Sequence, residues 1–110
     1  MKKRSNMDYY IFLVTVPNIE EGKKIGMILI ENKLAACVNI VDNILSIYQW
    51  KGKIEEENEC LLVIKTIEEN NEQLMQRISE IHSYETPECI GFKIEKGSEK
   101  YLNWITEVLE

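Results

Sequence analysis

Side chains that could bind a metal ion gather in one short stretch of this sequence. His82 is the only histidine of the chain, and Glu85 and Glu88 follow it closely. Imidazole and carboxylate groups together suit zinc, copper or nickel. One histidine and two carboxylates form only part of a ligand shell, because a structural zinc site needs about four ligands. The stretch therefore predicts a weak or subunit-shared site for a divalent metal, with Tyr84 as a further candidate ligand.

His82 and Lys65 each have a structural interpretation as well. His82 comes near the end of a predicted helix, where an imidazole can interact with the helix dipole or be partly buried. Lys65 ends an apolar strand, where it either extends its ammonium group into solvent or contacts an anion or effector. On the sequence alone, both pairs of alternatives stay open.

The cysteines do not form a recognisable metal-binding or disulfide motif. Cys37, Cys60 and Cys89 are odd in number, widely spaced and without a C-x-x-C pair. Because unpaired cysteine is common in protein interiors, we predict three buried free thiols in a reducing cytoplasm.

Length and composition predict one domain, residues 1–110, with a flexible start at residues 1–7. The 110 residues are 45% hydrophobic and 29% charged, which is typical of a globular protein, and no apolar run approaches the roughly 20 residues that span a bilayer. The net charge of -6 argues against nucleic acid or an anionic membrane as a partner and leaves cations as plausible ligands.

An enzymatic function is not predicted. The chain contains no G-x-S-x-G, Walker or H-E-x-x-H motif. Its only arginines, Arg4 and Arg77, fall in the flexible start and on the polar side of a helix, so neither suits a phosphate-binding loop. Catalysis by Cys37 would require His82 within about 3 Å, a geometry that the sequence cannot establish.

Residue patterns predict a ferredoxin-like α+β fold of the order βαββαβ with an added C-terminal helix. Strands are expected at residues 9–16, 34–50, 60–64 and 89–94, and helices at 19–32, 68–83 and 98–109. Pro17 ends the first strand because it lacks an N–H group, and Asn18 and Ser98 are expected to cap the helices that follow them.

The second and third strands are predicted to form a hairpin with its tip at residues 51–52 and a bulge at residues 42–43. The register that follows pairs Trp50 with Lys53, Tyr48 with Glu55, Cys37 with Thr66, and Cys60 with Asn43. The two aromatic residues can be explained by packing within the hairpin alone. The acidic run 55–59 is interpreted as a solvated strand, because neighbouring carboxylates project to opposite faces and chelate poorly.

The sheet is predicted to be covered by a second copy of the chain. Residues 60–64 are apolar at every position, which is typical of a strand buried on both faces. A ferredoxin-like fold places its helices on one face only, so an identical subunit is the simplest cover for the other.

Several linked motifs resemble the CutA family of divalent-ion tolerance proteins from about residue 9 to the end. They are Leu34-Ala35-Ala36-Cys37-Val38-Asn39-Ile40, Ser46-Ile47-Tyr48-Gln49-Trp50, Gly52-Lys53-Ile54-Glu55, Leu62-Val63-Ile64-Lys65-Thr66, His82-Ser83-Tyr84-Glu85-Thr86-Pro87-Glu88 and Tyr101-Leu102-Asn103-Trp104-Ile105. The resemblance implies a ferredoxin-like subunit in a tight trimer, with long hairpins pairing between subunits and a shape similar to PII-type signal proteins.

The resemblance also favours a ligand cleft between subunits. Its expected lining residues are Cys37, Tyr48, Trp50, Lys65 and Tyr84. Two positions depart from the family pattern: Ser83 stands where proline is usual, and Val14 stands where some bacterial members carry a cysteine. Copper binding attributed to that cysteine does not carry over to this chain.

Two functions follow as hypotheses. In the first, the chain is a cytoplasmic, trimeric divalent-cation tolerance protein that binds copper or zinc weakly through His82, Glu85 and Glu88, with no obligatory cofactor. In the second, it is a PII-like signalling or scaffold trimer whose cleft binds a small effector or a protein partner.

Overall fold

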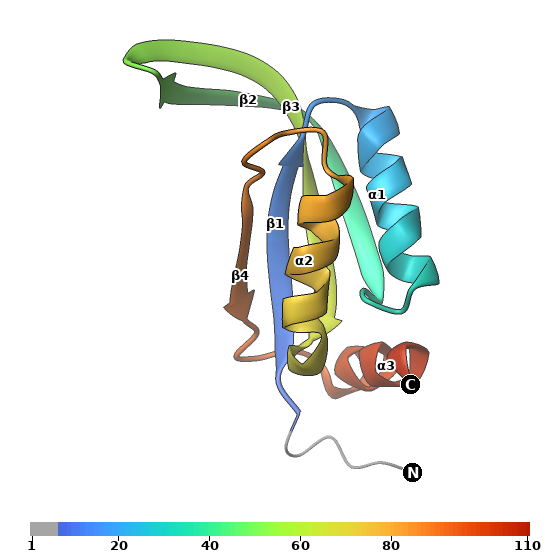
Figure 1. The fold of residues 1–110 in the computed structure, drawn as a ribbon. Helices are drawn as coiled ribbons and strands as arrows, with labels where there is room; N and C mark the ends of the chain where they lie inside the picture. The colour runs from blue at the N-terminus through green and yellow to red at the C-terminus, as the bar shows by residue number, and fades with distance from the viewer. Residues whose placement is uncertain (1–6) are drawn as a thin grey trace.

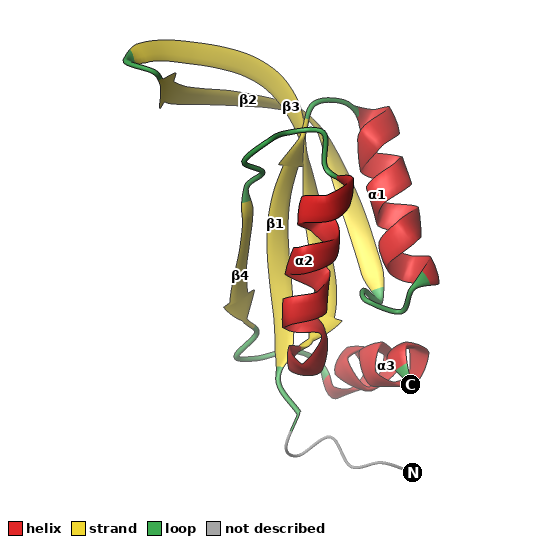
Figure 2. Cartoon of the chain, viewed as in Figure 1, coloured by secondary structure: helices red, strands yellow, loops and turns green. Residues whose placement is uncertain are grey.

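The computed structural model describes residues 7–110, so the predicted flexible start, apart from Met7, lies outside the described residues. The elements in chain order are β1 (Tyr9–Val16), α1 (Ile19–Glu31), β2 (Cys37–Trp50), β3 (Lys53–Ile67), the short 3-10 helix η1 (Glu68–Asn70), α2 (Asn71–Ile81), β4 (Cys89–Lys93) and α3 (Glu99–Leu109). The strands form one antiparallel sheet in the order β2-β3-β1-β4 (Figures 1 and 2). The predicted βαββαβ order with a closing helix is confirmed.

Both predicted helix caps are present. The Asn18 side chain accepts a hydrogen bond of 2.9 Å from the N–H of Glu21 at the start of α1. The Ser98 hydroxyl accepts a bond of 3.3 Å from the N–H of Tyr101 at the start of α3. Each cap satisfies a backbone donor that has no partner inside the helix, so both helices begin where the sequence predicts.

Several predicted boundaries were wrong. Strand β3 begins at Lys53 rather than at residue 60, because its acidic first half pairs with β2 along the whole hairpin. Residues 68–70 form a separate 3-10 turn, and α2 ends at Ile81, which leaves His82 as its extended C-cap and not inside the helix. Strand β2 begins at Cys37, three positions later than expected.

The core lies between the sheet and the pair of helices α1 and α2, which cover the same face (Figure 1). Alternate residues of β1 and β3 point into it and are buried. They are Phe12, Val14 and Val16 from β1, and Cys60, Leu62 and Ile64 from β3. From the helices, Ile25 and Leu29 of α1 and Leu74 and Ile78 of α2 complete this layer with no measurable exposure.

The other face of the sheet, here called the open face, is also apolar. Strand pairing places on it the side chains that alternate with the core residues: Ile11, Leu13, Val41, Leu61, Val63, Ile90 and Phe92. Neither α1 nor α2 covers this face, and Val41, Ile90 and Phe92 are exposed. A contiguous apolar surface of this kind marks a binding face rather than ordinary solvent-exposed surface.

The hairpin formed by β2 and β3 extends beyond the rest of the sheet (Figure 1). The register shifts between Val41 and Ile44, which places the predicted bulge at residues 42–43, and Asn43 there has a positive φ of 61°. The predicted tip is also confirmed, since Lys51 and Gly52 both have positive φ. A free two-stranded hairpin is at best marginally stable in water, so this projection with Ile54 79% exposed requires support from another surface.

Gly91 in β4 is required by close packing. It pairs with Phe12 of β1, and a Cβ atom added at Gly91 would lie 2.5 Å from Phe12 Cε2. We expect Gly91→Ala to lower the free energy of unfolding by about 1–3 kcal/mol, because the ring of Phe12 must shift within a packed core. Urea denaturation followed by circular dichroism measures this difference.

Gly26→Ala is the matched control. Its added Cβ would lie 3.4 Å from Val38 Cγ1, close to ordinary contact, and alanine is favoured over glycine within a helix by about 1 kcal/mol. This variant should be as stable as the parent or more stable. Equal unfolding midpoints for Gly91→Ala and the parent would contradict the packing argument.

Candidate functional site: an acidic, aromatic cleft beneath the hairpin

A cavity of about 820 Å³ lies between the projecting hairpin and the loop that joins α2 to β4. Its walls carry three aromatic side chains, Tyr48, Trp50 and Tyr84, and five carboxylates, Glu55, Glu57, Glu59, Glu85 and Glu88. No lysine, arginine or histidine is among the lining residues. The structure thus brings together five of the eight predicted site residues: Tyr48, Trp50, Tyr84, Glu85 and Glu88.

Strand alternation explains why the hairpin contributes three carboxylates to the same cleft. Glu55 pairs with Tyr48, and Glu57 and Glu59 follow at intervals of two residues on the same face of β3. The prediction that neighbouring glutamates diverge is correct, since Glu56 is not among the lining residues. The prediction that the whole acidic run 55–59 is exposed to solvent was wrong, because Glu59 is only 7% exposed.

Two tyrosine hydroxyl groups are anchored on these carboxylates. Tyr48 Oη donates to Glu57 Oε1 at 2.7 Å, and Tyr84 Oη donates to Glu59 Oε2 at 2.7 Å. The bond to Glu57 is the main cause that raises the pKa of Tyr48 from 10.0 to about 12. Burial, followed by the bond to Glu59, raises the pKa of Tyr84 well above its usual value. Both phenols therefore remain neutral at physiological pH and stay fixed against the walls of the cleft.

His82 holds the loop that carries Tyr84 and the two loop glutamates. Its Nδ1 accepts a bond of 3.0 Å from the N–H of Tyr84, so the ring proton sits on Nε2 and is donated to the carbonyl oxygen of Thr15 at 2.8 Å. The imidazole is fully buried, and its ring packs against that of Tyr84 at 4.8 Å between centroids. Both nitrogens are thus engaged by the protein, and the ring is buried, which favours the structural interpretation of His82.

Glu21 of α1 stabilises the same loop. Its Oε2 accepts a bond of 2.9 Å from the N–H of Ser83 and lies 3.6 Å from His82 Nδ1. A proline at position 83 could not donate this bond, so Ser83 adds an attachment between the loop and α1. The other unusual position, Val14, is fully buried in the core, away from any surface that a metal ion could reach.

The predicted metal ligands do not converge on one point. Within residues 7–110, no group of three or more His, Cys, Asp or Glu side chains is arranged to hold a metal ion. His82 would join Glu85 and Glu88 as a ligand only by giving up one of its two hydrogen bonds. Metal binding by these three residues stays a prediction.

Cys37 and Lys65 belong to a second group, remote from the cleft within one chain. Lys65 Nζ donates to Asn39 Oδ1 and lies 4.0 Å from Cys37 Sγ, and Tyr101 of α3 interacts with the same thiol. Cys37 and Tyr48 lie near opposite ends of β2, on a path of about 36 Å at roughly 3.3 Å per residue, and the bend at the bulge shortens this path without bringing the two groups together. The predicted five-residue cleft therefore cannot form within a single subunit.

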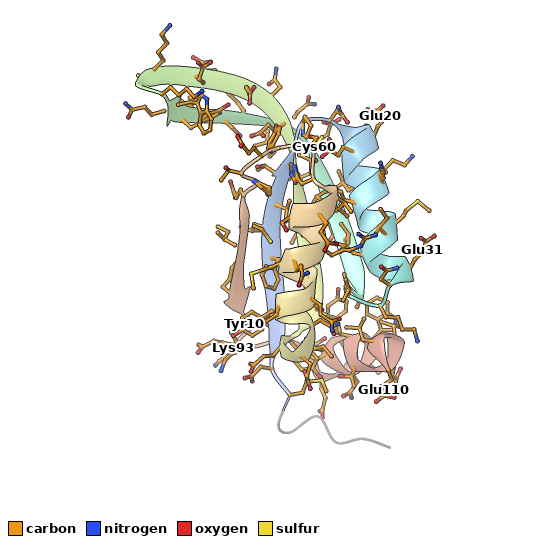
Figure 3. All side chains as sticks on the ribbon, in the orientation of Figure 1. Tyr10, Glu20, Glu31, Cys60, Lys93 and Glu110 are labelled. Carbon is orange, nitrogen blue, oxygen red and sulfur yellow. The ribbon has the colours of Figure 1, made fainter. Side chains whose placement is uncertain are left out.

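The three thiols are free, as predicted, but only Cys60 is buried. It lies where the hairpin leaves the sheet (Figure 3), with Sγ 3.2 Å from Asp42 Oδ1 in the bulge. Burial raises the pKa of Cys60, and it raises that of Cys89 to about 11. Both sulfurs remain protonated at neutral pH and are poor metal ligands or nucleophiles.

Known proteins share this sequence and fold over nearly the whole chain. The family model described as CutA1 divalent ion tolerance protein matches residues 10–108. This chain belongs to the CutA1 family. A divalent-cation tolerance protein CutA from Thermus thermophilus is 40% identical over 97 residues, which cover 88% of this chain and 94% of the relative. The chloroplastic protein CutA of Arabidopsis thaliana is 46% identical over 86% of this chain, but the match spans only 52% of that longer protein.

Solved CutA1 structures have the same fold. The Ehrlichia chaffeensis CutA1 structure superposes with a TM-score of 0.91 at 31% identity, covering 96% of this chain and 98% of the other. CutA1 from Oryza sativa gives 0.89 at 42% identity, covering 92% and 93%. The family is named for ion tolerance and not for a catalysed reaction. Its members are named as chloroplastic in Arabidopsis and periplasmic in Archaeoglobus fulgidus, so the cytoplasmic location of this chain stays a prediction.

No helix among the described residues has the length and apolar character needed to cross a membrane.

Sequence reasoning missed Glu55, Glu57 and Glu59 as lining residues of this cleft. The signal was available: Glu55, Glu57 and Glu59 alternate along one strand and must share a face with Tyr48. The alternation does not reveal that the hairpin bends, so that this face of β3 lies over the loop after α2. That geometry depends on the bulge at residues 42–43 and on the contact between Tyr84 and Glu59.

The phenol of Tyr48 should lose its proton at a higher pH than an ordinary tyrosine. Because its folded pKa of about 12 exceeds the ordinary value of 10.0, the folded state binds this proton more tightly. The resulting stabilisation is complete below pH 10 and is lost as the pH rises towards 12. In a titration followed by phenolate absorbance, Tyr48→Phe should remove one step near pH 12, and Glu57→Gln should move that step back towards pH 10.

Glu56→Gln, on the other face of the same strand, is the charge-matched control and should leave the step in place. A titration in which Glu57→Gln and Glu56→Gln behave alike would show that the hydrogen bond to Glu57 does not raise the pKa of Tyr48.

Proposed function

We propose that this CutA1-family chain contributes to divalent-ion tolerance as a homotrimer that binds divalent cations weakly, copper and zinc among them, in the cleft beneath the hairpin. The observation that carries the proposal is the set of five cleft glutamates with no basic residue among the lining side chains. Such a cavity concentrates cations by its negative potential. Because no three potential ligands converge in the part of the chain that the structure describes, the expected binding is weak and exchangeable rather than structural.

Glu85 and Glu88 are the proposed ligands on the loop. Neither has a described hydrogen-bond partner in the cleft, whereas Glu57 and Glu59 are already bonded to tyrosine hydroxyls. His82 supports the site by fixing the loop, and joins as a ligand if it releases the N–H of Tyr84. The apolar open face and the projecting hairpin support the trimer, because both need a cover that a second and third copy would supply.

Isothermal titration calorimetry with zinc and copper salts tests the metal proposal. We expect weak binding to the parent and about tenfold weaker binding to Glu85→Gln/Glu88→Gln, because two carboxylate ligands lose their charge. His82→Gln separates the two roles of the histidine, metal ligand and support of the loop. If His82 is a ligand, this variant should lose more copper affinity than Glu85→Gln/Glu88→Gln does.

Glu72→Gln, on the exposed surface of α2, is the control for net charge. Identical isotherms for the parent and Glu85→Gln/Glu88→Gln would contradict metal binding at this cleft.

A second candidate function, a PII-like trimer that binds a small effector, has one observation in its favour. Lys65 places an ammonium group on the open face, beside Asn39 and Cys37. A residue that served only to pack the sheet would not need a charged group at this position. In a trimer, such a group from one subunit would meet the surface of another.

A thermal-shift screen with anionic metabolites tests this candidate. We expect at least one anionic metabolite to raise the melting temperature of the parent and not that of Lys65→Ala, because a ligand that binds only the folded state stabilises it. Lys96→Ala, outside this group, should respond like the parent. A screen in which no anion raises the melting temperature of the parent would count against an anionic effector.

A further inference from the structure

We infer that Glu21 of α1 is a positioning residue for the cleft, because it holds the loop of residues 82–88 that carries Glu85 and Glu88. The inference rests on the proposed role of these two glutamates as metal ligands. Glu21 itself is not among the lining residues of the cleft. It belongs to a helix on the core side of the sheet, whereas the proposed trimer covers the open face, so its contact with the loop is made within one chain.

Hydrogen bonds to β1, to α1 and within the loop fix the first residues of the loop. The imidazole of His82 bonds to the carbonyl oxygen of Thr15 at 2.8 Å and to the N–H of Tyr84 at 3.0 Å. Between these two attachments, the N–H of Ser83 donates to Glu21 Oε2 at 2.9 Å. The start of α1 and the loop lie at the same end of the sheet (Figure 1). Glu21 therefore restrains the loop backbone directly, from the first turn of α1.

Glu21 is itself fixed in place. Its N–H is bonded at 2.9 Å to the capping side chain of Asn18, and its own side chain is only 16% exposed, so water competes little for its oxygens. A carboxylate at the start of a helix is stabilised by the helix dipole, and a hydrogen bond to a charged oxygen is stronger than one to a neutral acceptor. The same Oε2 also lies 3.6 Å from His82 Nδ1, so one oxygen faces two residues of the loop.

The residue type at position 83 explains why the loop needs this bond. A proline there would fix φ through its ring and would have no N–H to donate, whereas Ser83 leaves φ free. The hydrogen bond to Glu21 therefore restricts this part of the loop in place of a ring. Without the bond, the loop would sample more conformations. Metal binding by Glu85 and Glu88 would then be weaker, because it would have to order the loop at the same time.

Calorimetric titration of the full chain with zinc chloride tests the inference. We expect Glu21→Ala to weaken zinc binding about threefold to tenfold, because the loop must then be ordered during binding. Glu21→Gln should retain most of the affinity, because its amide oxygen still accepts the N–H of Ser83. Glu20→Ala is the matched control, since it removes the same charge at the exposed neighbouring position, and it should bind zinc as the parent does.

Ser83→Pro removes the donor of the same bond. This variant is expected to fold, because His82 already has the extended backbone, with φ -76° and ψ 143°, that a residue before proline prefers. In the Ser83→Pro background, Glu21→Ala should cause no further loss of zinc affinity, because the two changes remove one interaction. If Glu21 acted only by stabilising α1, the loss would persist in this background.

Amide hydrogen exchange of the metal-free protein, followed by NMR, gives a readout that does not depend on metal binding. In Glu21→Ala, the N–H of Ser83 should exchange about tenfold faster than in the parent or faster still, because it loses its acceptor. In Glu20→Ala, its exchange should match that of the parent.

The outcomes separate the inference from the proposed function. Three results would overturn the inference alone: equal zinc affinity in Glu21→Ala and the parent, equal losses in Glu21→Ala and Glu21→Gln, or a loss that persists after Ser83→Pro. Absence of zinc binding by the parent would overturn the proposed function and, with it, the effect of Glu21 on affinity. Hydrogen exchange would still decide whether Glu21 holds the loop, since unchanged exchange at Ser83 in Glu21→Ala would show that it does not.

Discussion

One sheet with two apolar faces is the constraint on which the rest of this structure depends. Helices α1 and α2 bury one face, and the side chains of the other, such as Leu13, Val63 and Phe92, have no helix of that pair over them. The hairpin adds exposed apolar side chains on its opposite face, where Ile54 is 79% exposed. Burial of apolar surface is the dominant driving force of folding and association, so in the proposed trimer contacts between copies would supply much of the stability that one chain lacks.

The same constraint explains the position of the cleft. The hairpin extends beyond the sheet, where the proposed trimer would place another copy, and its bulge at residues 42–43 bends it over the loop that follows α2. That loop is held by His82, whose imidazole connects Thr15 of β1 with the backbone of Tyr84. An acidic cavity results between a projecting ribbon and a fixed loop. The Lys65 group lies at the far end of the sheet, so only an assembly can bring the two groups near each other.

The sequence predicted the fold better than the site, for physical reasons. Caps, the hairpin tip and the bulge are local features, and Asn18, Gly52 and Asn43 indicate them by residue type alone. The pairing of Cys37 was wrong by one residue, with Lys65 opposite in place of Thr66, because the bulge shifts every pair beyond it. The hydrogen bond between His82 and Thr15 joins residues 67 positions apart, and no local pattern reveals such a contact.

Sedimentation equilibrium over a dilution series, with circular dichroism on the same samples, tests the central claim most directly. The account predicts a folded species of three chains that loses its structure as it dissociates, because the open face and the hairpin lose their cover together. A well-folded single chain at micromolar concentration would contradict the account, since the open face would then be stable in water.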